Sequence, residues 1–161
     1  MPVTDVRHDM DDLTLTITAE FDAPPERVWQ VYADPRQLER VWGPPSHPAT
    51  FVDHDLVPGA RVTYFMTAPD GEKFAGWWQV TAVDAPRELS FDDGFADADF
   101  NPVPHLPVSH NVYRFEEVDG RTRATFRSVY ESAEALQQVL DMGIIEGATL
   151  AMNQIDGLLA G

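Results

Sequence analysis

Residues 132–159 constrain the fold of this chain more than any other stretch. They contain no proline and begin with Ser132, a favourable N-cap residue, so the sequence predicts one long helix here. Apolar or small residues recur every three or four positions and predict a buried face, formed by Leu136, Leu140, Gly143, Gly147, Ala151, Ile155 and Leu158. The two central glycines each cost about 1 kcal/mol relative to alanine in a helix. We therefore expect either a closely packed neighbour at that face or an open space.

The chain before this helix is predicted to form mainly short strands. Residues 13–21 alternate apolar and polar side chains, as in a strand with one buried face. The residues before them are predicted to form a loose N-terminal segment without regular secondary structure. Prolines then favour the starts of two short helices, and the run Gly43-Pro44-Pro45 ends the second. A long surface loop is predicted at residues 92–107. Further strands are expected at residues 50–55, 61–67, 74–83, 88–91, 108–116 and 122–130.

These elements predict an α+β fold. A curved antiparallel sheet of about six to seven strands would wrap around the long C-terminal helix, with two short helices after the first strand. A length of 161 residues suits one domain spanning residues 1–161. A twisted sheet closed by one helix leaves a tapered space between them, which a small molecule can occupy.

Charge and composition limit the kinds of partner that the protein can bind. The chain has 11 Lys and Arg against 27 Asp and Glu, a formal net charge of -16, which disfavours nucleic acid and anionic membranes as partners. Neutral, apolar or cationic partners are expected instead. There is no cysteine and no apolar run long enough to insert into a membrane, so we expect a cytoplasmic protein.

Four blocks of the sequence resemble bacterial proteins similar to the activator of the heat-shock-protein-90 ATPase. The blocks read TITAEFDAPPERVWQVYADPRQLERVW before Gly43-Pro44, then PGARVTYFMTAPDG, GWWQVTAVDAPRELSF and MGIIEGATLAMNQIDGLLA. Such proteins belong to the helix-grip (SRPBCC) superfamily, which includes START lipid-transfer domains, polyketide cyclases and the birch-pollen allergen. The resemblance implies this fold, and the family name implies a role in chaperone activation. Family members commonly have two tryptophans where this chain has Val41-Trp42.

Aromatic, thioether and glycine residues are the candidates for lining a cavity between sheet and helix. Aromatic rings and methionines adapt to apolar ligands, while a few polar groups would orient them. The predicted ligand-binding residues are Trp42, Met66, Trp77, Gln79, Phe91, Tyr113, Met142, Gly143, Glu146 and Gly147.

Trp77 and Trp78 are adjacent in a predicted strand and must therefore point to opposite faces. Counting back in steps of two from an inward Val83 places Trp77 inside, unless a bulge intervenes. Trp78 would then lie on the outer surface, where it could form a homodimer contact.

No catalytic centre, cofactor site or metal site is predicted. His54 lies between Asp53 and Asp55, but in so acidic a chain this is better read as a solvated cluster than as a metal site. The sequence contains no G-x-S-x-G elbow and no phosphate-binding glycine loop. Glu146 lies on the shoulder of the predicted helix, either at a cavity mouth or as a solvated carboxylate.

Three functions remain open from the sequence. The leading one is noncatalytic binding of a small hydrophobic molecule in the cavity. The second is a polyketide cyclase-like or hydrolase-like enzyme using the same cavity, with Glu146 or His110 moving a proton. The third is a protein-interaction module such as a chaperone cofactor, which predicts a filled interior.

Overall fold

The computed structural model describes residues 2–160 as an α+β fold built on one antiparallel sheet. Eight strands lie in the order β1-β2-β8-β7-β6-β5-β4-β3. Their bounds are Val3–Asp9 (β1), Thr14–Phe21 (β2), Ala49–Asp53 (β3), Arg61–Thr67 (β4), Lys73–Asp84 (β5), Glu88–Ala96 (β6), Val108–Val118 (β7) and Arg121–Tyr130 (β8). This confirms the predicted fold class, with eight strands where about six to seven were expected.

Strand β1 accounts for the higher strand count, because residues 3–9 form a strand and not the loose N-terminal segment that was predicted. The strand pairs antiparallel with β2 and lies at the edge of the sheet. Most of its side chains are exposed, and only Val3 and Val6 pack against the core. An edge strand held mainly by backbone hydrogen bonds has no strong apolar alternation, so its sequence carried little signal.

Two short helices follow β2, as predicted. Helix α1 spans Pro25–Ala33 and α2 spans Pro35–Leu38. Both have proline in the first turn, where its missing N–H costs nothing. The Asp34 side chain caps α2 by accepting a 2.9 Å hydrogen bond from the backbone N–H of Arg36.

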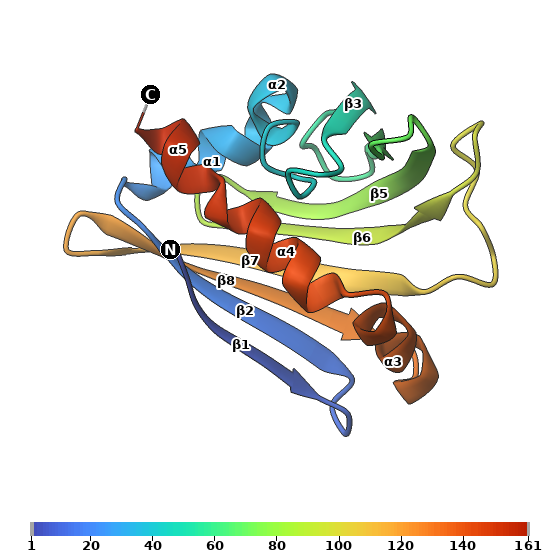
Figure 1. Ribbon diagram of the computed structural model, residues 1–161. Helices are drawn as coiled ribbons and strands as arrows, with labels where there is room; N and C mark the ends of the chain where they lie inside the picture. The colour runs from blue at the N-terminus through green and yellow to red at the C-terminus, as the bar shows by residue number, and fades with distance from the viewer. Residues whose placement is uncertain (1, 161) are drawn as a thin grey trace.

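The C-terminal helix is broken, so the prediction of one uninterrupted helix was wrong. It consists of α3 (Ala133–Asp141), α4 (Ile144–Asn153) and α5 (Ile155–Leu159). Gly143 separates the first two with a φ of 83°, a left-handed conformation that glycine adopts without the steric cost of a Cβ. In Figure 1, α4 and α5 cross the face of the sheet, and α3 lies beyond the break at a different angle.

The orientation of the paired tryptophans is the reverse of the prediction. Trp78 is fully buried and stacks on Phe91 with ring centroids 4.1 Å apart. Trp77 faces the other side of the sheet. A register shift between Val80 and Ala82 inserts an extra residue, so counting in steps of two from Val83 fails. The suggested homodimer contact through an exposed Trp78 thereby loses its basis.

Strand β6 continues to Ala96, five residues past its predicted end. Residues 92–96 were expected to be loop because Asp92, Asp93 and Gly94 are typical turn residues. All five pair instead with β5, and Asp92, Asp93 and Gly94 also pair with β7. The central position of β6 therefore fixes which of these residues face the interior. Among residues 2–160, no helix is both long and apolar enough to cross a membrane.

Candidate functional site

A cavity of about 350 Å³ lies between the inner face of the sheet and the C-terminal helices. This size falls within the range of small-molecule pockets, roughly 300–1,000 Å³. Met142 and Phe95 line it and are 53% and 36% exposed, which places the mouth of the cavity beside them. The wall is mostly apolar and includes Leu15, Ile17, Leu38, Val41, Phe126, Val139, Ile144, Ala148 and Met152.

The glycines of the C-terminal region border this cavity. Gly143 and Gly147 both line it, and a Cβ built at Gly147 would meet no atom within 4 Å. The space that mid-helix glycines suggested is therefore present, rather than another segment packed closely against them.

The most distinctive polar feature of the cavity is a hydrogen bond between Tyr64 and Asp93. The Tyr64 hydroxyl donates to Asp93 Oδ1 at 3.0 Å, and both residues line the cavity. Burial raises the pKa of Asp93 to about 7, although the bonds from Tyr64 and from the Gly94 backbone oppose this rise. Burial also raises the pKa of Tyr64 well above its usual value. The pair can therefore donate and accept hydrogen bonds near neutral pH.

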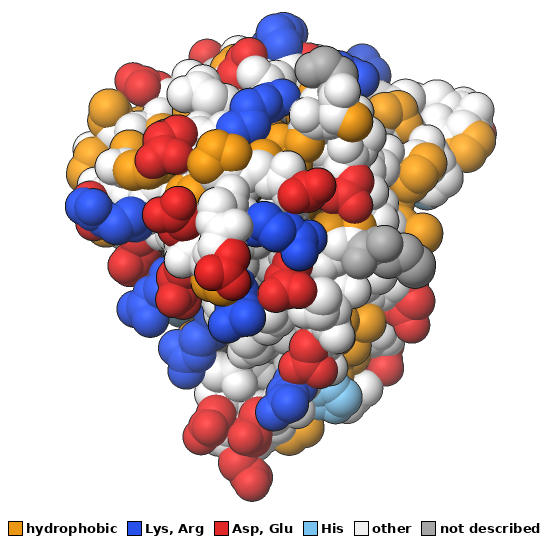
Figure 2. Space-filling model, turned by 90° about the vertical axis from the view of Figure 1, so that its left-hand side faces the viewer, with side chains coloured by type: hydrophobic (Ala, Val, Ile, Leu, Met, Phe, Trp, Pro, Cys, Tyr) orange, Lys and Arg blue, Asp and Glu red, His pale blue; other side chains and the backbone are white. Residues whose placement is uncertain are grey.

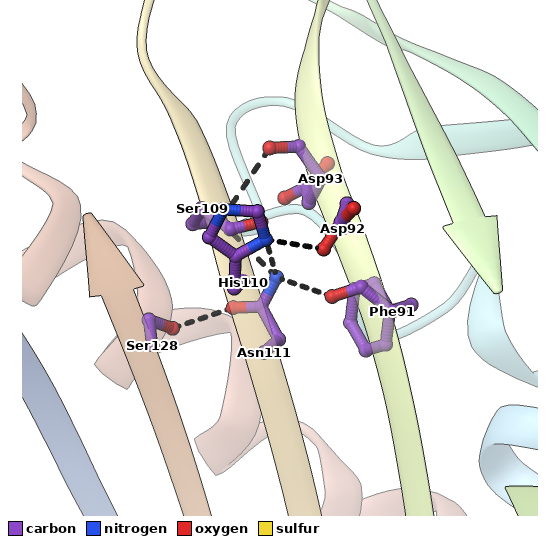
Figure 3. Close-up of polar contacts among 7 residues, drawn as sticks. All are labelled: Phe91, Asp92, Asp93, Ser109, His110, Asn111 and Ser128. Carbon is purple, nitrogen blue, oxygen red and sulfur yellow. Dashed lines mark hydrogen bonds and ion pairs between the residues drawn. The ribbon is translucent and has the colours of Figure 1, made fainter. Parts of the chain in front are cut away.

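A second polar group on the cavity wall is satisfied by its own bonds (Figure 3). Ser128 Oγ donates to Asn111 Oδ1 at 2.6 Å. The Asn111 amide donates to the Phe91 carbonyl at 3.2 Å and to Ser109 Oγ at 3.1 Å. These bonds tie β6, β7 and β8 together, so we assign the group a structural role.

Six of the predicted ligand-binding residues are brought together around this cavity. They are Trp42, Met66, Tyr113, Met142, Gly143 and Gly147. Trp42 packs edge-on against Tyr64 and Trp78, with ring centroids 5.7 and 4.9 Å away. Its indole N–H is buried without a hydrogen-bond acceptor among residues 2–160, so ring packing holds Trp42 in place. Contact of these six residues with a ligand stays a prediction.

Trp77 and Gln79 do not reach the cavity, and their predicted inward placement was wrong. The Trp77 indole N–H donates to the Phe95 carbonyl at 3.2 Å, and the guanidinium of Arg61 lies 4.9 Å from the ring centroid. The Gln79 amide donates to the Gly59 carbonyl at 2.9 Å. The bulge in β5 that turns Trp78 inward also turns both of these side chains outward.

Phe91 and Glu146 also lie outside the cavity lining. Phe91 is buried in the core, where Trp78 and Tyr113 pack on its ring. Glu146 is exposed in the first turn of α4, where its carboxylate favourably faces the positive end of the helix dipole. The break at Gly143 starts a new helix, so positions counted from Ser132 no longer predict which side Glu146 faces.

The histidines considered for chemistry have other partners. His110 is exposed on the outer face of the sheet, where Nδ1 lies 2.6 Å from Asp92 Oδ1 (Figure 3). His54 Nε2 lies 2.9 Å from the Tyr32 carbonyl, and burial lowers the pKa of this imidazole. Within residues 2–160, no group of three or more His, Asp and Glu side chains is placed to hold a metal ion.

Asp93 is the functional candidate that sequence reasoning missed. The signal was present, because Leu89, Phe91, Asp93 and Phe95 continue one alternating pattern along β6. Phe91 is inward, so the two-residue period carries Asp93 inward as well. The prediction ended the strand at Phe91 because Asp92, Asp93 and Gly94 are typical turn residues. It therefore placed Asp93 in a loop and not in the cavity wall.

The curved antiparallel sheet, closed by C-terminal helices over an internal cavity, defines a helix-grip protein. The family model of Activator of Hsp90 ATPase homolog 1-like proteins matches residues 22–160, and the chain belongs to that family.

Solved structures of relatives share this fold over almost the whole chain. The crystal structure of a Mycobacterium smegmatis protein is 74% identical, with 98% of this chain and 97% of the relative covered and a TM-score of 0.92. The NMR structure of an Arthrobacter aurescens protein is 48% identical, with 98% and 92% covered and a TM-score of 0.94. A Silicibacter pomeroyi protein named for the same family is 23% identical, with 91% and 97% covered and a TM-score of 0.73. No curated protein matches the chain.

Proposed function

We propose that this protein binds a small hydrophobic molecule that carries one polar group, in the cavity between the sheet and the C-terminal helices. The observation that carries this proposal is the combination of an apolar cavity of about 350 Å³ with the hydrogen-bonded pair Asp93 and Tyr64 in its wall. Transfer of apolar surface from water into such a site contributes roughly 25 cal/mol per Å². The Asp93–Tyr64 pair would form hydrogen bonds with the polar group of the ligand, whose burial without such bonds would be unfavourable.

The walls that hold this pair are rigid. Tyr64 and Asp93 lie on β4 and β6, and each strand is paired on both sides within the sheet. A site built on paired strands loses little conformational entropy when a ligand enters. The helical side of the cavity contains Gly143 and Gly147, which leave room for a ligand of small size.

Binding can be tested with naphthalene-2-methanol, an apolar bicyclic probe with one hydroxyl. We expect saturable one-to-one binding by isothermal titration calorimetry and a rise in melting temperature. At a free probe concentration about 100 times its Kd, the stabilisation should be about 2.7 kcal/mol.

A matched pair of variants locates the probe. Gly147→Leu directs a bulky side chain into open space at the cavity wall, so we expect at least a tenfold loss of affinity with folding retained. Gly157→Leu is the control, because Gly157 is exposed on α5, outside the cavity lining, with the same open surroundings. Equal binding by both variants and the parent chain would exclude this cavity as the site.

Acid–base catalysis in the same cavity is the second candidate. It is favoured by one observation, a partly buried carboxyl with a pKa of about 7 that is hydrogen-bonded to a tyrosine hydroxyl. A group with such a pKa can exchange a proton near neutral pH. An enzyme would convert a small molecule that copurifies with it, and mass spectrometry should show this conversion lost in Asp93→Asn while binding persists.

A further inference from the structure

Asp93 is a carboxyl group without a positively charged partner in the cavity. Among the described residues that line the cavity it is the only acid, and no Lys, Arg or His lines it. Its hydrogen-bonding partners are the Tyr64 hydroxyl and the Gly94 backbone. Neither carries a charge. Asp93 is partly buried, and a carboxylate that has lost much of its hydration is unfavourable until a cation pairs with it.

Most Lys and Arg side chains among residues 2–160 have partners outside the cavity. Arginines pair with acids at the molecular surface, and the closest of these pairs are Arg7 with Asp5 at 2.7 Å and Arg87 with Asp84 at 2.9 Å. Figure 2 shows Lys and Arg side chains interspersed with Asp and Glu on one outer face. A rearrangement that carried one of these side chains into the cavity would break such a surface pair.

The remainder of the cavity wall suits a positive charge attached to an apolar body. Aromatic faces attract cations, and this attraction strengthens when the pair is removed from water. The aromatic residues around the cavity are Tyr32, Trp42, Tyr64, Phe95, Tyr113, Phe126 and Tyr130. In addition, a net charge of -16 raises the local concentration of cations around the molecule and repels anions.

We propose that the cavity selects a hydrophobic amine, bound as a cation with its ammonium group against the Asp93 carboxylate and its apolar body against the aromatic walls. This inference rests on the proposed binding function and specifies its ligand class. A neutral alcohol of the same shape would gain only a hydrogen bond at Asp93. A carboxylic acid would place two like charges together and would be excluded.

Proton release is a distinctive consequence of this arrangement. The titratable groups facing Asp93 are Tyr64 on β4, Tyr113 on β7 and Tyr130 on β8, and burial raises the pKa of all three. They therefore stay neutral around pH 7, and α3 and α4 contribute no titratable side chain to the lining. An ammonium group stabilises the ionised form of Asp93, so binding at pH 7 should release roughly half a proton.

The test uses three probes that differ only in their polar group: naphthalen-2-ylmethanamine, naphthalene-2-methanol and 2-naphthoate. Calorimetry at pH 8 should show the amine binding at least tenfold more tightly than the alcohol, with 2-naphthoate weakest. Titration at pH 7 in two buffers of different ionisation enthalpy should show proton release for the amine and not for the alcohol.

Two aspartate variants separate contact with Asp93 from the general negative field. Asp93→Asn should abolish the preference for amine over alcohol while alcohol binding persists. Asp92→Asn removes the same charge from the outer face, where Asp92 contacts His110, and should retain the preference. Equal affinity for amine and alcohol in the parent chain, or an amine preference that survives in Asp93→Asn, would overturn the inference and leave the cavity proposal intact. Failure of all three probes to bind would count against the cavity proposal itself.

Discussion

The Tyr64 hydroxyl reaches Asp93 by crossing the strand that lies between them. Tyr64 is on β4 and Asp93 is on β6, and their 3.0 Å hydrogen bond spans β5 above Gly76. A methyl group at Gly76 would overlap the Cζ and Oη atoms of Tyr64. The polar pair of the cavity therefore depends on a residue without a side chain in the intervening strand.

The first prediction concerns this crossing. Gly76→Ala should displace the Tyr64 ring, break its hydrogen bond to Asp93 and lower the free energy of unfolding by about 1–3 kcal/mol. Gly120→Ala is a control away from the cavity lining, because Gly120 lies in the turn between β7 and β8 with a φ of 79°, a left-handed conformation that is unfavourable for alanine. Urea denaturation should show both variants destabilised. Naphthalene-2-methanol binding should weaken only in Gly76→Ala, and equal binding by both would contradict the role of Gly76.

Removal of the tyrosine hydroxyl alone gives a second prediction. The bond from Tyr64 opposes the rise in the pKa of Asp93 that burial causes. Tyr64→Phe keeps the ring but removes that donor, so the pKa of the Asp93 carboxyl should rise above its parent value of about 7. An NMR titration that follows the Asp93 carboxyl carbon measures this directly. An unchanged or lower pKa in Tyr64→Phe would show that the hydroxyl does not stabilise the carboxylate.

Asp93 should also make stability depend on pH. Its folded-state pKa of about 7 exceeds its usual 3.8, so between about pH 4 and pH 7 the folded state holds a proton that the unfolded chain has lost. This contribution to the free energy of unfolding is present at acidic pH and is lost as pH rises through 7. Asp93→Asn lacks the contribution, so its melting temperature relative to the parent chain should be highest above pH 7 and fall toward pH 5. A difference that does not vary with pH would contradict the assigned pKa.

The two glycines beside the cavity should respond oppositely to alanine. Gly143 has a φ of 83°, so Gly143→Ala should destabilise the protein by about 1–2 kcal/mol through the left-handed conformation. Gly147 is helical with open space beside it, so Gly147→Ala should stabilise by up to about 1 kcal/mol through helix propensity. Urea denaturation of both variants measures the difference. Similar changes in both would mean that α3 and α4 join into one helix in solution.

The sequence by itself determined the order of the elements, most strand positions and the side of the C-terminal region on which space remains. These features come from local patterns. The strand at Arg61–Thr67 was predicted to the residue because alternation and flanking turns lie within a few positions of each other. Gly143 and Gly147 drew attention to the cavity because glycine is costly in a helix unless its surroundings require it.

Only the tertiary structure decided which side chains meet inside the cavity. The inward or outward direction of a strand residue depends on every register step along its partners, and one bulge after Val80 reversed Trp77 and Trp78. Gly143 has a conformation that ends one helix and starts another, and this choice depends on packing rather than propensity. The tertiary structure also made Asp93 a candidate for ligand binding. Its negative charge is unfavourable only where neighbouring strands and helices keep water and basic side chains away from it.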